Sequence, residues 1–222
     1  MIRTAVLFDM DGLMVDTEPL ARRSWERVTA DFGVTMSDEL FNRMLGRRTV
    51  ESAQMVLEEL PIPLSPDELV ERKTAEYLSS LDGSVPAMPG LWFLLDRLDR
   101  ENIPWAVATS TPRAVAEIVL GKLGVDGRYQ ALACGDEVKH GKPAPDIFLL
   151  AAERLGVSPE ACLALEDSAT GCAAAATAGM RVIAVPAEFT AGGNFTCAYH
   201  VYPSLVEVAQ DLSELLKNPA VG

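Results

Sequence analysis

The sequence predicts an α/β fold in which a parallel sheet carries helices on both faces and an all-helical domain is inserted after the first strand. Three observations support this prediction. Short apolar runs, typical of strands buried on both faces, alternate with helical patterns. The alternation stops between residues 17 and 84, where only helical patterns occur. Polar residues follow several strands directly, and ligands bind at that edge of a parallel sheet.

Five apolar runs are expected to form the strands. In chain order they are Thr4–Phe8, Trp105–Ala108, Gln130–Cys134, Ala161–Leu165 and Arg181–Val185. Helices of the core are expected at Leu91–Leu98, at Ala114–Leu123 before Gly124, and at Ala169–Ala178 before Gly179. We expect Thr111 and Ser168 to cap the second and third of these helices.

The segment from residue 17 to residue 84 is predicted to be a separate helical cap domain. Its expected helices are Pro19–Phe32, Ser37–Met44, Val50–Leu60 and Pro66–Leu81. The stretch Asp82-Gly83-Ser84-Val85-Pro86 has the composition of a linker. The economical interpretation is a discontinuous, Rossmann-like catalytic core of residues 1–16 and 85–222.

Composition limits the classes of function. The 222 residues allow a large core, and 49% of them are hydrophobic, so the chain is not a disordered tail. A formal charge of −13 disfavours binding to nucleic-acid polymers. With only two histidines, a multi-histidine zinc centre is excluded, but a carboxylate metal site is not. No run approaches the ~20 apolar residues of a membrane span or resembles a signal peptide, so we expect a cytoplasmic protein without membrane contacts.

The predicted strands end in acids and hydroxyl residues. These sequences are Asp9-Met10-Asp11-Gly12, Thr109-Ser110-Thr111 and Glu166-Asp167-Ser168. Carboxylates gathered at one edge repel one another unless a cation or protons neutralise them. Mg²⁺ prefers such hard oxygen ligands, and Asp9, Glu166 and Asp167 can supply them. The sequence therefore predicts a magnesium site at this edge.

The same edge offers groups that bind an anion. The hydroxyls of Thr109 and Ser110 and the helix start at Ser168 can hold a phosphate. Lys142, in His140-Gly141-Lys142-Pro143, adds a compact positive charge suited to phosphate. This edge can therefore hold an anion such as the phosphate group of a small phosphorylated metabolite.

These motifs resemble those of the haloacid dehalogenase superfamily, in its branch of helical-cap phosphatases and β-phosphoglucomutases. Phe8–Leu13 with Asp16-Thr17-Glu18 resembles the first family motif, and Thr109-Ser110 the second. Lys142–Asp146 resembles the third, and Leu165–Ser168 the fourth. Their order and approximate spacing agree over the whole chain.

The resemblance implies a Mg²⁺-dependent phosphatase that hydrolyses a sugar phosphate or nucleoside monophosphate. Asp9 would be the nucleophile that forms an aspartyl phosphate. Asp11 would be the general acid for the leaving alcohol and then the base that activates water. The implied metal ligands are Asp9, the carbonyl of Asp11, Glu166 and Asp167, and the implied phosphate-binding groups are Thr109, the Ser110 N–H and Lys142. An acid at position 11 is not needed when halide leaves, so dehalogenation is not expected.

The inserted helices are expected to lie over Asp9 as a lid that excludes water and selects the substrate. The family uses a glycine loop of the cap to meet the leaving group, and Leu45-Gly46-Arg47-Arg48-Thr49 resembles that loop. The candidate substrate contacts are Gly46, Arg47, Arg48, Lys73 and Arg113. For each of the cations, a solvated side chain on a helix surface is the alternative.

Two other functions remain open. In β-phosphoglucomutases an arginine lies three positions after the glycine, where this chain has Thr49, and a lysine follows the second motif, where this chain has Pro112 and Arg113. Both differences favour a phosphatase, with a phosphomutase as the alternative, and the stretch Gly46–Val70 resembles the pseudouridine-5′-phosphatase-like branch. A catalytically silent phosphate-binding protein is the second alternative, which would lack Mg²⁺-dependent turnover. We expect a monomer or weak dimer.

Overall fold

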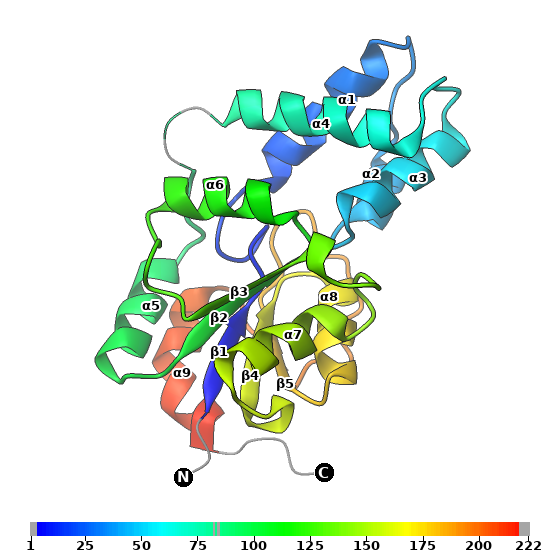
Figure 1. The fold of residues 1–222 in the computed structure, drawn as a ribbon. Helices are drawn as coiled ribbons and strands as arrows, with labels where there is room; N and C mark the ends of the chain where they lie inside the picture. Colours follow the sequence, from blue (N-terminus) through cyan, green and yellow to red (C-terminus); the bar gives the residue numbers. More distant parts are fainter. Residues whose placement is uncertain (1–3, 82, 84, 218–222) are drawn as a thin grey trace.

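The structure is a computed structural model that describes residues 4–81, 83 and 85–217. Its centre is a six-stranded parallel sheet with the order β3-β2-β1-β4-β5-β6 (Figure 1). The strands are β1 (Ala5–Phe8), β2 (Trp105–Thr109), β3 (Ala131–Cys134), β4 (Cys162–Glu166), β5 (Arg181–Ala184) and β6 (His200–Val201). All five expected strands are present. The sixth is short and exposed on both residues, so no apolar run marks it.

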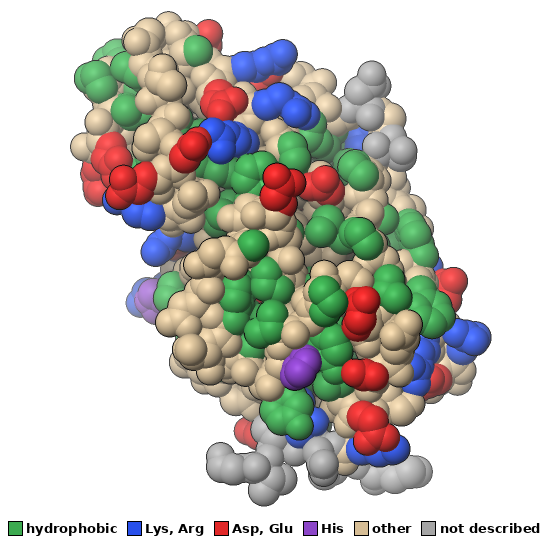
Figure 2. Space-filling model, turned by 180° about the vertical axis from the view of Figure 1, so that it is seen from behind, with side chains coloured by type: hydrophobic (Ala, Val, Ile, Leu, Met, Phe, Trp, Pro, Cys, Tyr) green, Lys and Arg blue, Asp and Glu red, His purple; other side chains and the backbone are tan. Residues whose placement is uncertain are grey.

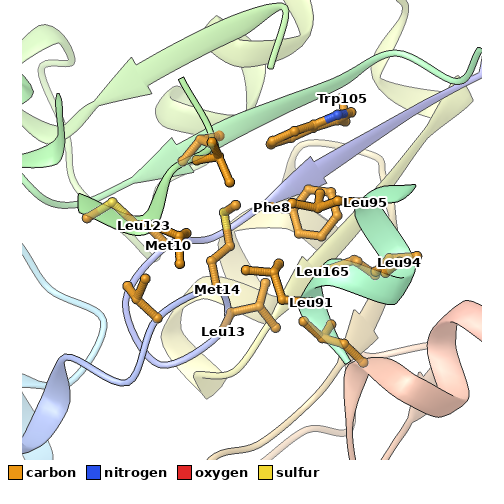
Figure 3. Packing of buried hydrophobic residues seen from close by; sticks show 14 of the residues in the cluster. Phe8, Met10, Leu13, Met14, Leu91, Leu94, Leu95, Trp105, Leu123 and Leu165 are labelled. Atoms are coloured by element: carbon orange, nitrogen blue, oxygen red, sulfur yellow. The ribbon is translucent and has the colours of Figure 1, made fainter. Parts of the chain in front are cut away.

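The alternation of side chains along β1 builds a core on each face of the sheet. Val6 and Phe8 pack into one hydrophobic cluster, whereas Ala5 and Leu7 pack into the other. Figure 3 shows Phe8 among the leucines of α5 (Leu91–Arg100) and near Trp105 of β2. The two aromatic rings meet edge to face, with centroids 5.5 Å apart. Burial on both faces explains why these strands are apolar throughout.

Helices cover both faces, which confirms the predicted fold class. The first cluster contains residues of α5, α6 (Arg113–Leu123) and α9 (Leu205–Lys217). The second contains residues of α7 (Asp146–Leu155) and α8 (Ala169–Thr177). Two of these helices, α7 and α9, are additional to the expected ones. In α9 the buried residues recur at helical spacing, a pattern that could have predicted it; they are Leu205, Val208, Ala209, Leu212 and Leu215.

The inserted segment is helical, as expected. It contains α1 (Glu18–Ala30), α2 (Asp38–Met44), α3 (Thr49–Glu59) and α4 (Pro66–Ser80). These helices have a hydrophobic cluster of their own, built around Trp25, Phe41 and Leu69. Figure 1 shows them above the sheet, on the side where the chain leaves β1. Asp82 and Ser84 of the expected linker lie outside the described residues, so the boundary at residue 84 stays a prediction.

The surface carries charges of both signs. Figure 2 shows, on the side opposite to that of Figure 1, acidic and basic side chains interspersed rather than gathered in one patch.

Among the described residues, no helix combines the length and the apolar character that crossing a membrane requires.

Candidate active site

A tight loop directly after β1 positions the two acids of the first motif. The N–H of Met14 donates to the carbonyl of Met10 at 2.8 Å, and the N–H of Gly12 donates to the carbonyl of Val15 at 2.9 Å. Gly12 has a φ of +81°, a left-handed conformation that favours glycine. A Cβ at this position would also collide with the carboxylate of Asp167. Glycine therefore allows the loop to turn while β1 and β4 bring their acids together.

Lys142 is the positive centre of the site. The residue is only 2% exposed, and its Nζ donates to Oδ1 of Asp9, to Oε1 of Glu166 at 2.6 Å and to the carbonyl of Ala108 at 3.3 Å. Burial alone lowers the pKa of Lys142, but the carboxylates of Asp9 and Glu166 outweigh it and raise the pKa. The ammonium group therefore stays charged and joins the ends of β1 and β4.

Three buried acids lie together next to this lysine. Carboxylate oxygens of Asp9, Glu166 and Asp167 all lie within 4.8 Å of one another. Burial raises the pKa of Asp9 and of Asp167 well above the usual range, and the negative charges of neighbouring acids raise both further. In such a cluster the ionised carboxylates are unfavourable without a partner. A divalent cation stabilises them, because its charge offsets their burial and their mutual repulsion. These residues therefore fit Mg²⁺.

Glu166 is held more tightly than the other two acids. The backbone N–H of Ser168 donates to Glu166 Oε2 at 3.1 Å and its hydroxyl donates to the same oxygen at 3.0 Å, while Lys142 occupies Oε1. The Ser168 hydroxyl also accepts from the N–H of Gly171 at 3.0 Å, which confirms the expected cap of α8. Both oxygens of Glu166 thus have protein donors.

Hydroxyl groups hold the carboxylate of Asp11. Thr17 donates to Oδ1 at 2.6 Å, and Thr111 donates to Oδ2 at 2.7 Å. The expectation that Thr111 caps α6 is wrong, because Pro112 occupies the N-cap position with an extended backbone and the Thr111 hydroxyl is engaged by Asp11. Thr109 also donates to Asp11 Oδ2, at 3.4 Å. The carboxylate is thereby oriented from the cap side and from β2.

A cavity lies between this edge of the sheet and the cap. From the core it is lined by Asp9, Asp11, Thr109 and Ser110 among others. The cap contributes the predicted residues Gly46, Arg47 and Lys73, and also residues that the sequence analysis did not single out as substrate contacts, namely Thr17, Glu18, Trp25, Thr74 and Tyr77. The Ser110 hydroxyl donates to the carbonyl of Gly46 at 2.8 Å, which joins the second motif to the glycine loop.

Of the four cations predicted to contact the substrate, two do not line this cavity. Arg48 forms an ion pair with Glu51 and donates to the carbonyl of Val138 at 3.2 Å. Arg113 forms ion pairs with Glu117 and Glu137. Both guanidinium groups are therefore used for contacts within the protein. Arg48 nevertheless connects α3 of the cap to the loop that leads to Lys142.

Thr190 is a further polar residue at the site that the motifs did not indicate. Its hydroxyl donates to Asp167 Oδ2 at 3.2 Å and accepts from the N–H of Ala187 at 2.9 Å. The residue is 6% exposed and lies in the loop after β5. A single threonine in a loop of mixed composition has no pattern by which sequence analysis could identify it.

Comparisons with known proteins agree with this geometry. A family model of haloacid dehalogenase-like hydrolases matches residues 4–179. The chain is 37% identical over 180 residues to the fructose-1-phosphate phosphatase YqaB of Escherichia coli, covering 81% of this chain and 95% of that protein. It is 35% identical over 213 residues to hexitol phosphatase B of the same species, covering 94% and 96%. The crystal structure of CbbY from Rhodobacter sphaeroides in complex with phosphate matches with a TM-score of 0.85 and 32% identity, covering 94% of this chain and 96% of that one. The chain therefore belongs to the haloacid dehalogenase-like hydrolases.

Proposed function

We propose that this protein is a Mg²⁺-dependent phosphatase that hydrolyses a small phosphate monoester, of a sugar or a nucleoside, through an aspartyl phosphate. One observation carries the proposal: the buried ammonium of Lys142 contacts Glu166 and Asp9, and Asp9 lines a cavity together with Asp11. The names of the relatives, which are phosphatases of fructose 1-phosphate and of hexitols, support the substrate class.

In the first step, the carboxylate of Asp9 attacks the phosphorus atom, and the bond between phosphorus and the ester oxygen breaks. Asp11 gives its proton to the leaving alkoxide, so that a neutral alcohol departs. Thr17 and Thr111 keep the Asp11 carboxyl in place for this transfer. Lys142, Thr109 and the N–H of Ser110 bind the oxygens of the transferred group.

In the second step, Asp11 takes a proton from water, whose oxygen attacks the phosphorus atom of the aspartyl phosphate. Inorganic phosphate leaves and the Asp9 carboxylate is restored. Mg²⁺, held by Asp9, the Asp11 carbonyl, Glu166 and Asp167, would neutralise the negative charge on the phosphoryl oxygens. The cap of residues 17–84 would close over the core and exclude bulk water until the alcohol has left.

Phosphate release from a panel of sugar and nucleoside monophosphates tests this proposal, with Mg²⁺ and with a chelator in excess. We expect release that requires Mg²⁺ and disappears in Asp9→Asn. Arg47 and Lys73 both line the cavity and could hold a second phosphate, which is the observation that favours a phosphomutase. Isomerised sugar phosphate with little free phosphate would identify that activity, and binding without any turnover would indicate a silent phosphate-binding protein.

A further inference from the structure

A residue of the core packs against the hydrophobic cluster of the cap. This residue is Phe189, in the loop between β5 and β6, and the other described residues of the cluster all lie between residues 25 and 70. Its ring meets that of Phe41 on α2 edge to face, with centroids 6.0 Å apart. Helix α2 ends at Met44, directly before the loop whose Gly46 carbonyl accepts from Ser110. Phe189 therefore holds the part of the cap that contacts the second motif.

The next residue along the chain, Thr190, contacts one of the three buried acids. Its hydroxyl donates to Oδ2 of Asp167 at 3.2 Å. The other two acids of the cluster both contact the ammonium of Lys142. Within residues 4–81, 83 and 85–217, by contrast, Thr190 is the one hydrogen-bond donor to the Asp167 carboxylate. The hydrogen bonding of Asp167 therefore depends on a single hydroxyl group.

A tight turn joins these two contacts. The N–H of Thr190 donates to the carbonyl of Ala187 at 3.1 Å, and the N–H of Ala187 donates to the Thr190 hydroxyl at 2.9 Å. These hydrogen bonds close the turn Ala187–Thr190, and Phe189 lies within it. A shift of the Phe189 ring therefore moves the hydroxyl that holds Asp167.

The turn borders open space. A second cavity, of about 240 Å³, lies beside it between α2 and the start of α8. Its lining includes Asn42 and Leu45 from the cap, Thr170 from α8, and Phe189 and Gly192 from the loop. A Cβ at Gly192 would meet no atom within 4 Å. Because packing is absent on this side of the loop in the described residues, the contact with the cap helps to determine where the turn lies.

We propose that the turn Ala187–Thr190 couples docking of the cap to cation binding at Asp167. With the cap docked, Phe189 fixes the turn, and Thr190 holds the carboxylate in place for a divalent cation. Because such a coupling acts equally in both directions, a cation bound at Asp167 also stabilises the docked cap. The inference rests on the proposed function, since it takes the cluster of three acids as the Mg²⁺ site.

Calorimetric titration with Mg²⁺ tests the metal side of this coupling. Thr190→Val keeps the shape of the side chain but removes the hydroxyl. It should raise the Kd for Mg²⁺ by about 10-fold, as for other groups that orient metal ligands. Thr190→Ser retains the hydroxyl and should restore the wild-type Kd. The control is Thr177→Val, which removes an exposed hydroxyl at the end of α8 and should leave the Kd unchanged.

Phe189→Ala tests the link to the cap, because it removes the ring that packs on Phe41. The variant should increase hydrogen exchange in α2 and also raise the Kd for Mg²⁺ by about fivefold. In the wild-type protein Mg²⁺ should slow hydrogen exchange in α2, and Thr190→Val should lose this effect. The matched control is Phe32→Ala, since Phe32 packs against the same cluster from within the cap and its loss should leave the Kd unchanged.

Two results would overturn the coupling. One is a Kd for Mg²⁺ that is the same in Phe189→Ala and in the wild-type protein, and the other is an equal Kd in Thr190→Val and Thr190→Ser. Neither result would affect Mg²⁺-dependent phosphate release by the wild-type protein. Failure of the wild-type protein to bind Mg²⁺ would instead contradict the proposed function.

Discussion

The ammonium group of Lys142 lies 2.6 Å from Oε1 of Glu166, and the two side chains are 1% and 0% exposed. The same ammonium contacts Asp9, so one positive charge serves two buried carboxylates. Burying these charged groups costs desolvation free energy when the protein folds. Removing one of them from the folded protein costs more, because it leaves an unpaired buried charge. The candidate catalytic centre is therefore also a structural element of the fold.

Lys142→Met should reduce both stability and activity. Two carboxylates lose their neutralising charge, so we expect the free energy of unfolding to fall by about 3–5 kcal/mol, as for other broken buried pairs. Urea unfolding measures the first effect and phosphate release the second. The control is Lys217→Met, since Lys217 pairs with Glu214 at the surface and both side chains are exposed. A Lys142→Met protein with wild-type stability and turnover would remove this lysine from the site.

Thr111→Val should lower the rate of the reaction more than it affects stability. The substitution keeps the shape of the side chain but removes the hydroxyl that donates to Asp11, so this residue is less well placed for the proton transfer proposed for it. We expect kcat to fall by about 10- to 100-fold, in proportion to the ~1–3 kcal/mol that a lost hydrogen bond to a charged group costs. Thr111→Ser keeps the hydroxyl and should keep most of the rate. Equal rates for the valine and serine variants would contradict this role.

Glu18 should make the stability of the ligand-free protein depend on pH. Burial and the charges of Asp11 and Asp16 outweigh Lys73 and raise the pKa of Glu18 to about 7, from 4.5. The folded protein therefore binds this proton more tightly than the unfolded chain. The free energy of unfolding that this tighter proton binding contributes is fully present below pH 4.5 and is lost as the pH rises through 7.

Glu18→Gln removes this loss, so the variant should be more stable than the wild-type protein near neutral and alkaline pH, by at most about 3 kcal/mol. The difference should disappear at about pH 4.5. Thermal unfolding of both proteins at several pH values measures this difference in stability. The control is Glu26→Gln, which changes the partner of Arg22 on the same helix and should show no such trend. A Glu18→Gln advantage that is the same at every pH would contradict the raised pKa of Glu18.

Arg48 should couple the cap to the loop that carries Lys142. Its guanidinium donates to the carbonyl oxygens of Val138 and Lys139 at 3.2 Å and 3.4 Å, and it forms an ion pair with Glu51. Arg48→Ala should therefore increase hydrogen exchange in residues 138–142 and reduce kcat/KM without unfolding the core. The comparison variant is Arg43→Ala, in which only a surface contact with Glu59 is lost. Unchanged exchange in this loop would show that Arg48 does not hold it.

Much of the fold could be predicted because the core strands are buried on both faces, and such strands are continuous apolar runs. The acidic residues of the candidate site could also be predicted, since Asp9 and Asp167 follow strands β1 and β4. Strand β6 could not be predicted, because a pair of exposed residues carries no pattern. Helix α9 was not among the expected elements, although its apolar residues recur at helical spacing and could have predicted it.

The supporting residues of the site were harder to predict than the acids. Thr111 precedes Pro112 in a sequence typical of a helix cap, and only the geometry shows that its hydroxyl contacts Asp11. Arg48 stands beside Arg47 in the same loop, yet only Arg47 lines the cavity. Neighbouring residues of one type can point in different directions at a helix start, and tertiary packing decides which one reaches the ligand.

The central claim is that Asp9 receives the phosphoryl group. The most direct test is to trap the phosphorylated protein in a single turnover with Mg²⁺ and a sugar phosphate radiolabelled in its phosphoryl group. Asp11→Asn should slow both the labelling of the protein and the loss of the label, because the proposed acid for the leaving alkoxide and the proposed base for water are the same group. We expect the label on Asp9 in the wild-type protein and none on Asp9→Asn, with Asp31→Asn as an exposed control that behaves like the wild type. Rapid phosphate release by Asp9→Asn, or turnover in which the label never reaches the protein, would contradict an aspartyl-phosphate mechanism.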